Sequence, residues 1–514
     1  MRMKKCSRKY WIFYLNAKFN ILRYRNVYNY KGDPEKPKEL DAKNLVFMYE
    51  AAKERLAEIG EKPIVLMCSW SPAGYLKNHD IEFGMWKGTL KKENGQFVYE
   101  KYGKYWAELV QAYRNKGLPI DFISIQNECD FLADYEGCLF GENETTEKPS
   151  YSKAFMSVYK EIQKIENPPK MMGPETMSVE PNTIQHYMEE VMKEMPESVY
   201  AIAHHLYSGS GNEKEVNGYN QDFIGLQQRY PSLPKWQTEY GRGDFLATAQ
   251  LVQNSLYYEN LTAYLYWTGT VDDEEGALIA IDPRISQPKK NWILKNGYEA
   301  SEQYYAMRHF SEFIRPGYVR IDTNVSTEEV SFTAYVDKSQ SKMVGVAINA
   351  GNEDKTIQLQ FANYKLASGS AIISTKGGEM YQTKDELFDM QNQTLKISAN
   401  SVVTVNLTGI TDVSTSSGIG TSSIDLSGVQ VVSPIMKGEP KLTGSEDPIW
   451  SNAKTYRIQN IANGDHGASA SFKTYYDDSN LYVQVKVSDS TKMIDGEKES
   501  TKDNVEFYLN ESGE

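Results

Sequence analysis

The stretch "FISIQNECDF", residues 122–131, indicates how this chain is built. It begins with apolar residues typical of a buried strand and then passes directly into Gln126, Asn127 and Glu128. Polar groups at the end of an apolar run are costly to bury unless something pairs with them. The sequence therefore predicts a strand whose end presents Glu128 to a functional site.

The same arrangement recurs along the first half of the chain, where short apolar runs alternate with stretches of helical periodicity. The predicted strands span residues 19–25, 63–70, 121–128, 170–176, 200–207, 235–241 and 263–267. Strand–helix alternation implies parallel strands, because parallel neighbours need crossover connections. Nearly every run ends in a polar or aromatic residue, and no GxGxxG opens a helix. We therefore expect an α/β fold of the (β/α)8 TIM-barrel type rather than an open doubly wound sheet.

The sequence pattern changes near residue 320, where successive strand-like runs separated by turn residues predict an antiparallel sandwich. A stretch of small polar residues follows, and alternating strands then return. The predicted domains are a catalytic barrel at 1–315, a side β-sandwich at 316–410, a Ser/Thr/Gly linker at 411–430 and a partial β-sandwich at 431–514.

Composition excludes several classes of partner. Lys plus Arg is 56 and Asp plus Glu is 69, a net charge of −13 that argues against nucleic acid and anionic membranes. No apolar run reaches about 18 residues, so no membrane span is expected. The 4 Cys lack metal-site or disulfide spacing, so we expect no metal or cofactor. A monomer is expected.

Glu128 and Glu239 each end a predicted strand, and two other predicted strands lie between them. In a barrel, both side chains then point into one pocket. Glycoside hydrolysis requires such a pair, one carboxylic acid to protonate the leaving oxygen and one carboxylate to attack or to activate water. The sequence thus predicts a glycosidase site.

Further residues are candidates for the surroundings of the two glutamates. They are Trp70, Asn127, Tyr207, Trp267, Arg25 and His205. We expect Asn127 to bind a sugar hydroxyl, and Tyr207 and His205 to orient Glu239. The two tryptophans are candidates for a sugar platform, and the arginine for pairing a buried carboxylate. For Trp267 core packing is equally consistent, and Glu175 fits a structural or a site role.

At these residues the sequence resembles glycoside hydrolase family 30, in particular its bacterial xylanase branch. The matching stretches run in family order through residues 20–322 and include "ILRYRNVY", "CSWSPAGYLKN", "ISIQNECDF", "HHLYSG", "WQTEYG", "AYLYW" and "YYAMRHFSEFIRPGYVRID". The resemblance implies a retaining endo-β-1,4-xylanase with Glu128 as acid/base and Glu239 as nucleophile. It places Asn127, Tyr207 and the two tryptophans in the sugar subsites, and makes xylan or another plant cell-wall polysaccharide the partner.

Two features depart from the family pattern. Only about 18 residues precede "FNILRYR", where the family has a strand and a helix, so we expect the first barrel strand to be missing. The loop after the last strand carries acids at residues 272–275 and no Arg before Arg284. Four acids repel a uronate, so we expect cleavage that does not depend on glucuronate branches.

The C-terminal piece, from "PIWSNAKTYRIQN" to "DNVEFYLNESGE", resembles the first half of a family 9 carbohydrate-binding module. Secretion is expected from a polymeric substrate, although the N-terminus has no clear signal peptide. Two alternatives stay open. One is another family 30 hydrolase, of the β-glucosidase or β-1,6-glucanase type; the other is a non-catalytic sugar-binding protein or an incomplete fragment.

Overall fold

The structure is a computed structural model, in which the chain forms two compact units, residues 1–417 and 418–514. The described residues are 16–28, 40–78, 88–133, 136–271, 277–281, 298–321, 323, 329–337, 342–359, 364–365, 368–408, 411–412, 436–437, 449–450, 456–458, 469–476 and 481–488. The acids at 272–275, Arg284, and the predicted linker beyond residue 412 lie outside these ranges.

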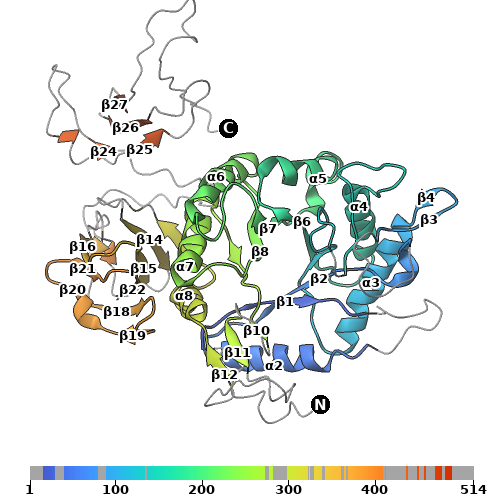
Figure 1. The fold of residues 1–514 in the computed structure, drawn as a ribbon, viewed down its shortest axis with the longest axis horizontal. Helices are drawn as coiled ribbons and strands as arrows, with labels where there is room; N and C mark the ends of the chain where they lie inside the picture. The colour runs from blue at the N-terminus through green and yellow to red at the C-terminus, as the bar shows by residue number, and fades with distance from the viewer. Residues whose placement is uncertain are drawn as a thin grey trace, which may run out of the picture. The chain divides into compact units, whose positions relative to one another are not determined.

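A curved parallel sheet forms the centre of the first unit (Figure 1). Within the described residues it has seven strands, in the order β1-β2-β5-β6-β7-β8-β9. Their bounds are β1 Ile21–Arg25, β2 Ile64–Cys68, β5 Phe122–Ser124, β6 Lys170–Ser178, β7 Ala201–Ser208, β8 Lys235–Glu239 and β9 Ala263–Tyr264. Each coincides with a predicted strand. The strand predicted over 121–128 stops at Ser124, because the chain turns before Glu128.

Helices between the strands cover the outside of this sheet (Figure 1). They are α2 Lys43–Ala57, α3 Tyr99–Asn115, α4 Tyr151–Ile162, α5 Pro181–Glu194, α6 Asn220–Arg229, α7 Phe245–Asn254 and α8 Glu302–Ser311. In α3, Tyr102, Trp106, Leu109 and Tyr113 are buried at the i, i+3 or i+4 spacing of one helix face. This amphipathic pattern is why each helix packs on the sheet, and the architecture is that of a (β/α)8 barrel.

The barrel is open between its two edge strands. Among the described residues β1 pairs only with β2, and β9 pairs only with β8. A cavity of about 880 Å³ lies at this seam, lined by residues of both edges such as Ile21, Tyr24, Ala263 and Tyr264. The expected absence of one barrel strand is confirmed for the described part of the chain.

A β-sandwich follows the barrel in the same unit. One sheet has the order β13-β14-β15-β22-β18-β19, and a smaller one the order β16-β21-β20. The bounds are β13 Val319–Ile321, β14 Val330–Asp337, β15 Lys342–Asn349, β16 Lys355–Gln358, β18 Ser368–Thr375, β19 Gln382–Thr383, β20 Phe388–Asp389, β21 Thr394–Ile397 and β22 Ser401–Thr408. The two sheets bury side chains between them, among them Leu395 and Val403. Thr411–Asp412 (β23) pairs with Tyr364–Lys365 (β17), so strand pairing continues two residues into the predicted linker.

The described parts of the second unit form a small antiparallel sheet with one short parallel pair. It contains β24 Met436–Lys437, β25 Tyr456–Ile458, β26 Ser469–Tyr476 and β27 Leu481–Ser488. Trp450 and Tyr475 pack edge to face at its core, with ring centroids 5.4 Å apart. This is the β-rich structure that the alternating sequence predicts.

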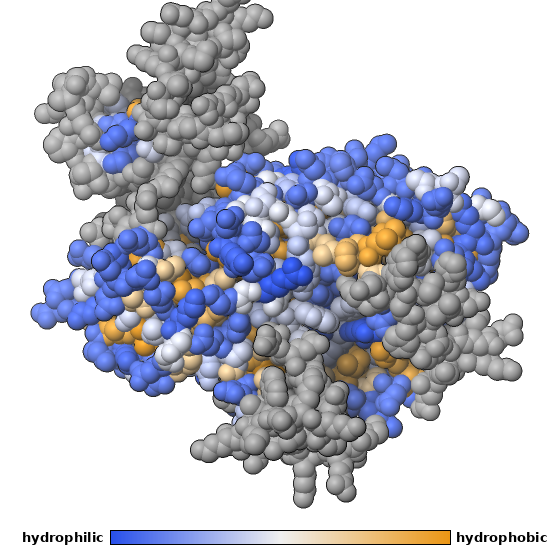
Figure 2. Space-filling model, in the orientation of Figure 1, coloured by the Kyte–Doolittle hydropathy of each residue, from blue (hydrophilic) through white to orange (hydrophobic). Residues whose placement is uncertain are grey.

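The described surface is largely hydrophilic on the face in Figure 2, where hydrophobic residues form separate patches. Large apolar side chains that remain exposed include Phe47, Phe131, Leu132, Trp267 and Val319. None of the described helices is long and apolar enough to cross a bilayer. Among these side chains, Trp267 stands out because it adjoins a polar cluster at one end of the barrel.

Candidate active site

Side chains from the carboxyl ends of the parallel strands converge at one end of the barrel. The contributing residues are Arg23 in β1, Glu175 in β6, His205 and Tyr207 in β7, Glu239 in β8, Asn127 and Glu128 just after β5, Trp70 just after β2 and Trp267 just after β9. The carboxyl ends of barrel strands meet at one face, so residues far apart in sequence become neighbours there.

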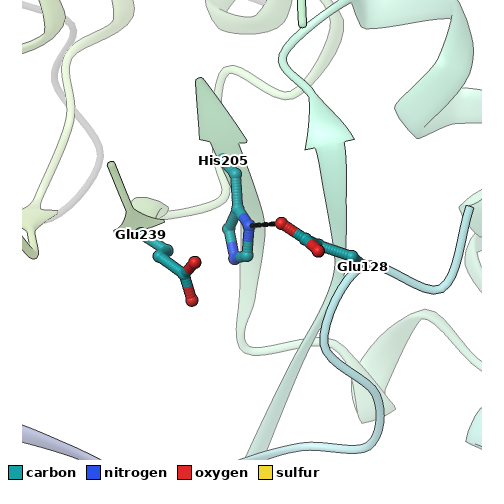
Figure 3. Close-up of side chains that lie close together, drawn as sticks. All are labelled: Glu128, His205 and Glu239. Atoms are coloured by element: carbon teal, nitrogen blue, oxygen red, sulfur yellow. Dashed lines mark hydrogen bonds and ion pairs between the residues drawn. The ribbon is translucent and has the colours of Figure 1, made fainter. Parts of the chain in front are cut away.

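Glu128 and Glu239 lie on either side of the His205 ring (Figure 3). His205 Nδ1 lies 3.2 Å from Glu128 Oε1 and donates to it. One ligand atom from each of the three residues lies within 4.8 Å of the other two. Both carboxylates are only 6% exposed, so they interact in a largely water-free environment.

His205 bonds to a different glutamate than the sequence suggested. We expected it to orient Glu239, but its hydrogen bond goes to Glu128. The left-handed backbone at Glu128, with φ 48°, turns this carboxylate toward β7. Burial lowers the pKa of His205, but the charge of Glu239 and the bond to Glu128 outweigh burial and raise the pKa above 6.5.

Arg23 connects the carboxylates at the centre of the cluster. Its Nη1 donates to Glu239 Oε2 at 2.7 Å, and its Nη2 donates to Asn127 Oδ1 at 2.7 Å. Its Nε donates to Glu175 Oε1 at 3.1 Å. Because the guanidinium plane is rigid, these contacts fix Glu239, Asn127 and Glu175 relative to one another.

Glu175 is the counter-charge of this arginine. The side chain is fully buried, and Cys68 Sγ lies 2.7 Å from its Oε2 and donates to it. Burial alone raises the pKa of Glu175, but the charge of Arg23, assisted by His205, outweighs burial and lowers the pKa to about 2. Glu175 is therefore ionised at neutral pH.

Tyr207 holds the second oxygen of Glu239. Its hydroxyl donates to Glu239 Oε1 at 3.2 Å. Burial and the charge of Glu239 raise the pKa of Tyr207, so the phenol stays protonated and remains a donor. Arg242 stacks on the outer side of Tyr207, with Cζ 5.1 Å from the ring centroid. Tyr207 thus contacts Glu239, the residue that the sequence predicted it to orient.

Trp70 and Trp267 contact each other, with ring centroids 5.6 Å apart. Trp70 is buried, and the Arg23 guanidinium lies over its ring at 4.7 Å. Trp267 is 43% exposed, so it is the ring that presents a face to solvent. The pair therefore consists of an inner, buried ring and an outer, exposed ring.

Arg25 is the last residue of β1, two positions after Arg23. It forms an ion pair with the buried carboxylate of Glu136. This is the type of partner that the sequence suggested for Arg25. Arg23 and Arg25 share one face of β1, because they are two residues apart. Arg23 contacts Glu175 and Glu239, whereas Arg25, at the end of the strand, pairs with Glu136 instead.

Close backbone packing builds the site. Glu128 and Glu175 both adopt positive φ, 48° and 55°, a conformation uncommon for residues other than glycine. A Cβ on Gly241 would lie 1.5 Å from the carbonyl oxygen of Trp267. The glycine in "TEYG" is thus required because the chain after β8 passes directly against the chain after β9.

The spacing of Glu128, His205 and Glu239 is compatible with one bound cation. Both Glu239 oxygens already accept hydrogen bonds, one from Arg23 and one from Tyr207. Each Glu239 oxygen thus already has a hydrogen-bond partner among the described residues.

Sequence reasoning left Arg23 and Cys68 out of the site, and it left Glu175 open between a structural and a site role. Arg23, Glu175 and Cys68 form its buried base. A signal for Arg23 existed, because a charged residue between the buried Leu22 and Tyr24 must face the barrel interior. No local signal separates Cys68 from an ordinary core cysteine.

Comparisons with known proteins agree with this architecture. Residues 442–514 match the family model described as carbohydrate family 9 binding domain-like. Glucuronoxylanase XynC of Bacillus subtilis is 24% identical over 340 residues, which cover 63% of this chain and 68% of the relative. Endo-1,6-beta-D-glucanase neg1 of Aspergillus fumigatus is 21% identical over 271 residues, and the match covers 49% of this chain and 51% of the relative.

A solved structure matches over most of the chain. It is the glycoside hydrolase family 30 subfamily 8 xylanase Xyn30A from Clostridium acetobutylicum, with a TM-score of 0.59 and 21% identity, covering 77% of this chain and 91% of that chain. The chain therefore has the fold of the glycoside hydrolase family 30 xylanases, and it ends in a segment like the family 9 carbohydrate-binding domains.

Proposed function

We propose that the chain is a retaining endo-β-1,4-xylanase that uses Glu128 and Glu239. The observation that carries this proposal is the approach of the two carboxylates, whose nearest oxygens lie within 4.8 Å. Retaining glycosidases hold their two carboxyl groups about 5–5.5 Å apart, whereas inverting enzymes need roughly 6.5–9.5 Å to admit a water. The close approach of these oxygens supports the shorter, retaining arrangement, in which a carboxylate attacks.

The two glutamates have different partners, and this difference supports separate roles for them. Glu239 accepts hydrogen bonds from Arg23 and Tyr207, which hold both of its oxygens in place, and we propose it as the nucleophile that attacks the anomeric carbon. Glu128 carries the proton that passes to the leaving oxygen as the glycosidic bond breaks. In the second step Glu128 takes a proton from water, and the resulting hydroxide displaces Glu239 from the sugar.

The substrate assignment rests on the relatives and on the exposed platform. XynC and Xyn30A are named as xylanases. The exposed Trp267 ring offers a flat apolar face against which a sugar ring packs. The C-terminal segment is proposed to hold the enzyme on the polysaccharide, and such a substrate places the enzyme outside the cell. The chemistry needs no cofactor.

Independence from glucuronate is proposed from the sequence of the loop after β9. Residues 272–275 are all acidic, and these like charges repel a uronate branch. Equal rates on glucuronoxylan and on linear xylan would support this proposal. A strict requirement for glucuronate would refute it.

A β-1,6-glucanase is the second candidate function, favoured by the similarity to the Aspergillus fumigatus enzyme. Rates on β-1,6-glucan and on linear, arabinose-branched and glucuronate-branched xylan separate the two candidates. Proton NMR of the first product then reports the anomer. We expect xylan to be cleaved with retention of the β-anomer.

Glu128→Gln and Glu239→Gln test the assigned residues on the same substrates. General acid catalysis is worth about 10²–10⁴-fold, so we expect at least that loss for Glu128→Gln. We expect Glu239→Gly to recover turnover with azide and to release a product of inverted anomer. Unchanged hydrolysis in either glutamine variant would refute the mechanism.

A further inference from the structure

Glu175 occupies an unusual backbone position in β6. It is fully buried and has φ 55°, and the pairing of β6 with β7 shifts register on either side of Thr176. Its carbonyl oxygen accepts from the Glu128 amide at 2.9 Å. A left-handed residue in the middle of a strand is a strained conformation that persists only where the surroundings hold it, and such residues cluster at functional sites.

The side chain of Glu175 reaches the other catalytic glutamate through Arg23. Its Oε1 accepts from Arg23 Nε at 3.1 Å, and its Oε2 lies 3.4 Å from Arg23 Nη2. This paired contact fixes the plane of the guanidinium. The remaining Nη1 then points at Glu239, at 2.7 Å.

Charge balance gives Glu175 a second role. Arg23 is the cation that contacts both Glu175 and Glu239, and each of these residues is buried. With both carboxylates present, the arginine is more than neutralised. With Glu175 uncharged, the whole positive charge would act on Glu239, and a carboxylate held so strongly is a weaker nucleophile.

We infer that Glu175 is a positioning residue for both catalytic glutamates. Its carboxylate orients Arg23 toward Glu239 and offsets part of the positive charge that acts on Glu239, and its backbone carbonyl holds the Glu128 amide. The inference rests on the proposed function. It assigns no contact between Glu175 and substrate. Its consequence is that a residue buried beneath the sugar site sets the pH range in which hydrolysis proceeds.

Glu259 provides a matched control on the other face of the sheet. It is also fully buried, and its Oε1 accepts from His204 Nε2 at 2.8 Å. His204 adjoins His205 in β7, but its side chain points away from the cluster. Glu259→Gln therefore removes a comparable buried carboxylate without touching the proposed catalytic residues.

The experiment compares Glu175→Gln, Glu175→Asp and Glu259→Gln with the wild-type chain on linear xylan. Removing one negative charge favours the ionised forms of neighbouring carboxylates, so both limbs of the pH profile of kcat/KM should move to lower pH in Glu175→Gln. Loss of a hydrogen bond between charged groups should lower kcat of Glu175→Gln by about 10–100-fold, with little change in KM. Glu175→Asp keeps the charge, so its limbs should stay near those of the wild type. Glu259→Gln should change neither the limbs nor kcat.

Different outcomes test the positioning role of Glu175 and the proposed function. If the wild-type chain hydrolyses xylan and Glu175→Gln leaves both kcat and the pH profile of kcat/KM unchanged, the positioning role is overturned and the proposed function stands. A loss of stability in Glu175→Gln equal to that in Glu259→Gln, with normal kinetics, would also overturn it. If Glu175→Gln fails to fold, Glu175→Asp decides: lower kcat with wild-type limbs supports the role, and unchanged kcat overturns it. A wild-type chain inactive on every glycan would overturn the proposed function and this inference together.

Discussion

His205 and His309 are both completely buried, yet their surroundings have opposite effects on their charge. His205 lies between Glu128 and Glu239, and its pKa is raised above 6.5. His309, in α8, lies 2.8 Å from the hydroxyls of both Thr404 and Ser374 in the sandwich. Burial and the charge of nearby Arg308 lower its pKa to about 3.

The difference distinguishes a site from a structural contact. Around His205 the barrel mouth collects Arg23 and three carboxylates, an arrangement in which every removed charge leaves another one unbalanced. Around His309 the partners are neutral hydroxyls, which satisfy the ring without charge. Buried charge is concentrated where chemistry is proposed, while buried polar groups at the barrel–sandwich contact serve cohesion.

The largest expected effect comes from removing the cation of the charged region. Arg23→Met leaves Glu175 and Glu239 buried without their counter-charge, and breaking such a pair costs about 3–5 kcal/mol of unfolding free energy. Urea unfolding followed by circular dichroism measures this. Arg114→Met is the control, because Arg114 donates only to backbone carbonyls at residues 120, 166 and 167. Equal losses of unfolding free energy in the two variants would contradict the role of Arg23 as the counter-charge of two buried carboxylates.

The histidines themselves give the next effect. His205→Gln weakens a hydrogen bond to a charged group, worth about 1.5–3 kcal/mol, so kcat/KM should fall roughly 10–100-fold. His309→Gln should lower the unfolding free energy and leave kcat/KM of the folded enzyme unchanged. Hydrolysis rates on xylan and urea unfolding curves are measured for both variants, so that the effect on kcat/KM and the effect on stability can be compared in each. A similar kinetic loss in His309→Gln would show that the two histidines do not differ in their effect on hydrolysis.

The pH dependence of stability sharpens the same comparison. His309 titrates near 6.5 when unfolded and near 3 when folded, so between these values only the unfolded state binds the proton. Its stabilising contribution is complete above pH 6.5 and is lost as pH falls toward 3, by up to about 1.4 kcal/mol per pH unit. His205 has the opposite sign, since its raised pKa gives stability that is lost as pH rises through the folded value.

Unfolding in urea from pH 7 to pH 4 checks the His309 contribution. We expect His309→Gln to show a shallower loss of stability on acidification than the wild-type chain. His186→Gln serves as the control, because the His186 side chain is 52% exposed. Identical slopes for wild type and His309→Gln would show that this histidine does not control the acid limb.

The smallest expected effect concerns the exposed ring at the site. Trp267→Ala removes a stacking face worth about 1 kcal/mol, which corresponds to a roughly 5-fold rise in KM with kcat nearly unchanged. Tyr257→Ala is the control, since Tyr257 is 38% exposed in the π-helical turn after α7. Steady-state kinetics on xylo-oligosaccharides measure both variants. A larger effect on kcat than on KM would mean that Trp267 positions the reacting sugar.

Periodicity and strand-end chemistry were sufficient to predict the barrel strands and the glutamate pair. Apolar runs of the right length indicate that Glu239 ends β8 and that Glu128 follows shortly after β5. The partner of His205 was wrong, because the turn after β5 and the register shift within β7 decide it. Such irregularities arise from tertiary packing and leave no periodic signal.

By itself the sequence determined the order of strands and helices, the sandwich that follows the barrel, and the two glutamates at strand ends. These properties are local, because the spacing of buried residues and the ends of strands depend on residues that are consecutive in the sequence. Only the tertiary structure decided that Arg23 lies among Glu239, Asn127 and Glu175. Those contacts join residues 104, 152 and 216 positions away from Arg23, and which side chains meet across a closed sheet depends on the curvature of the whole barrel.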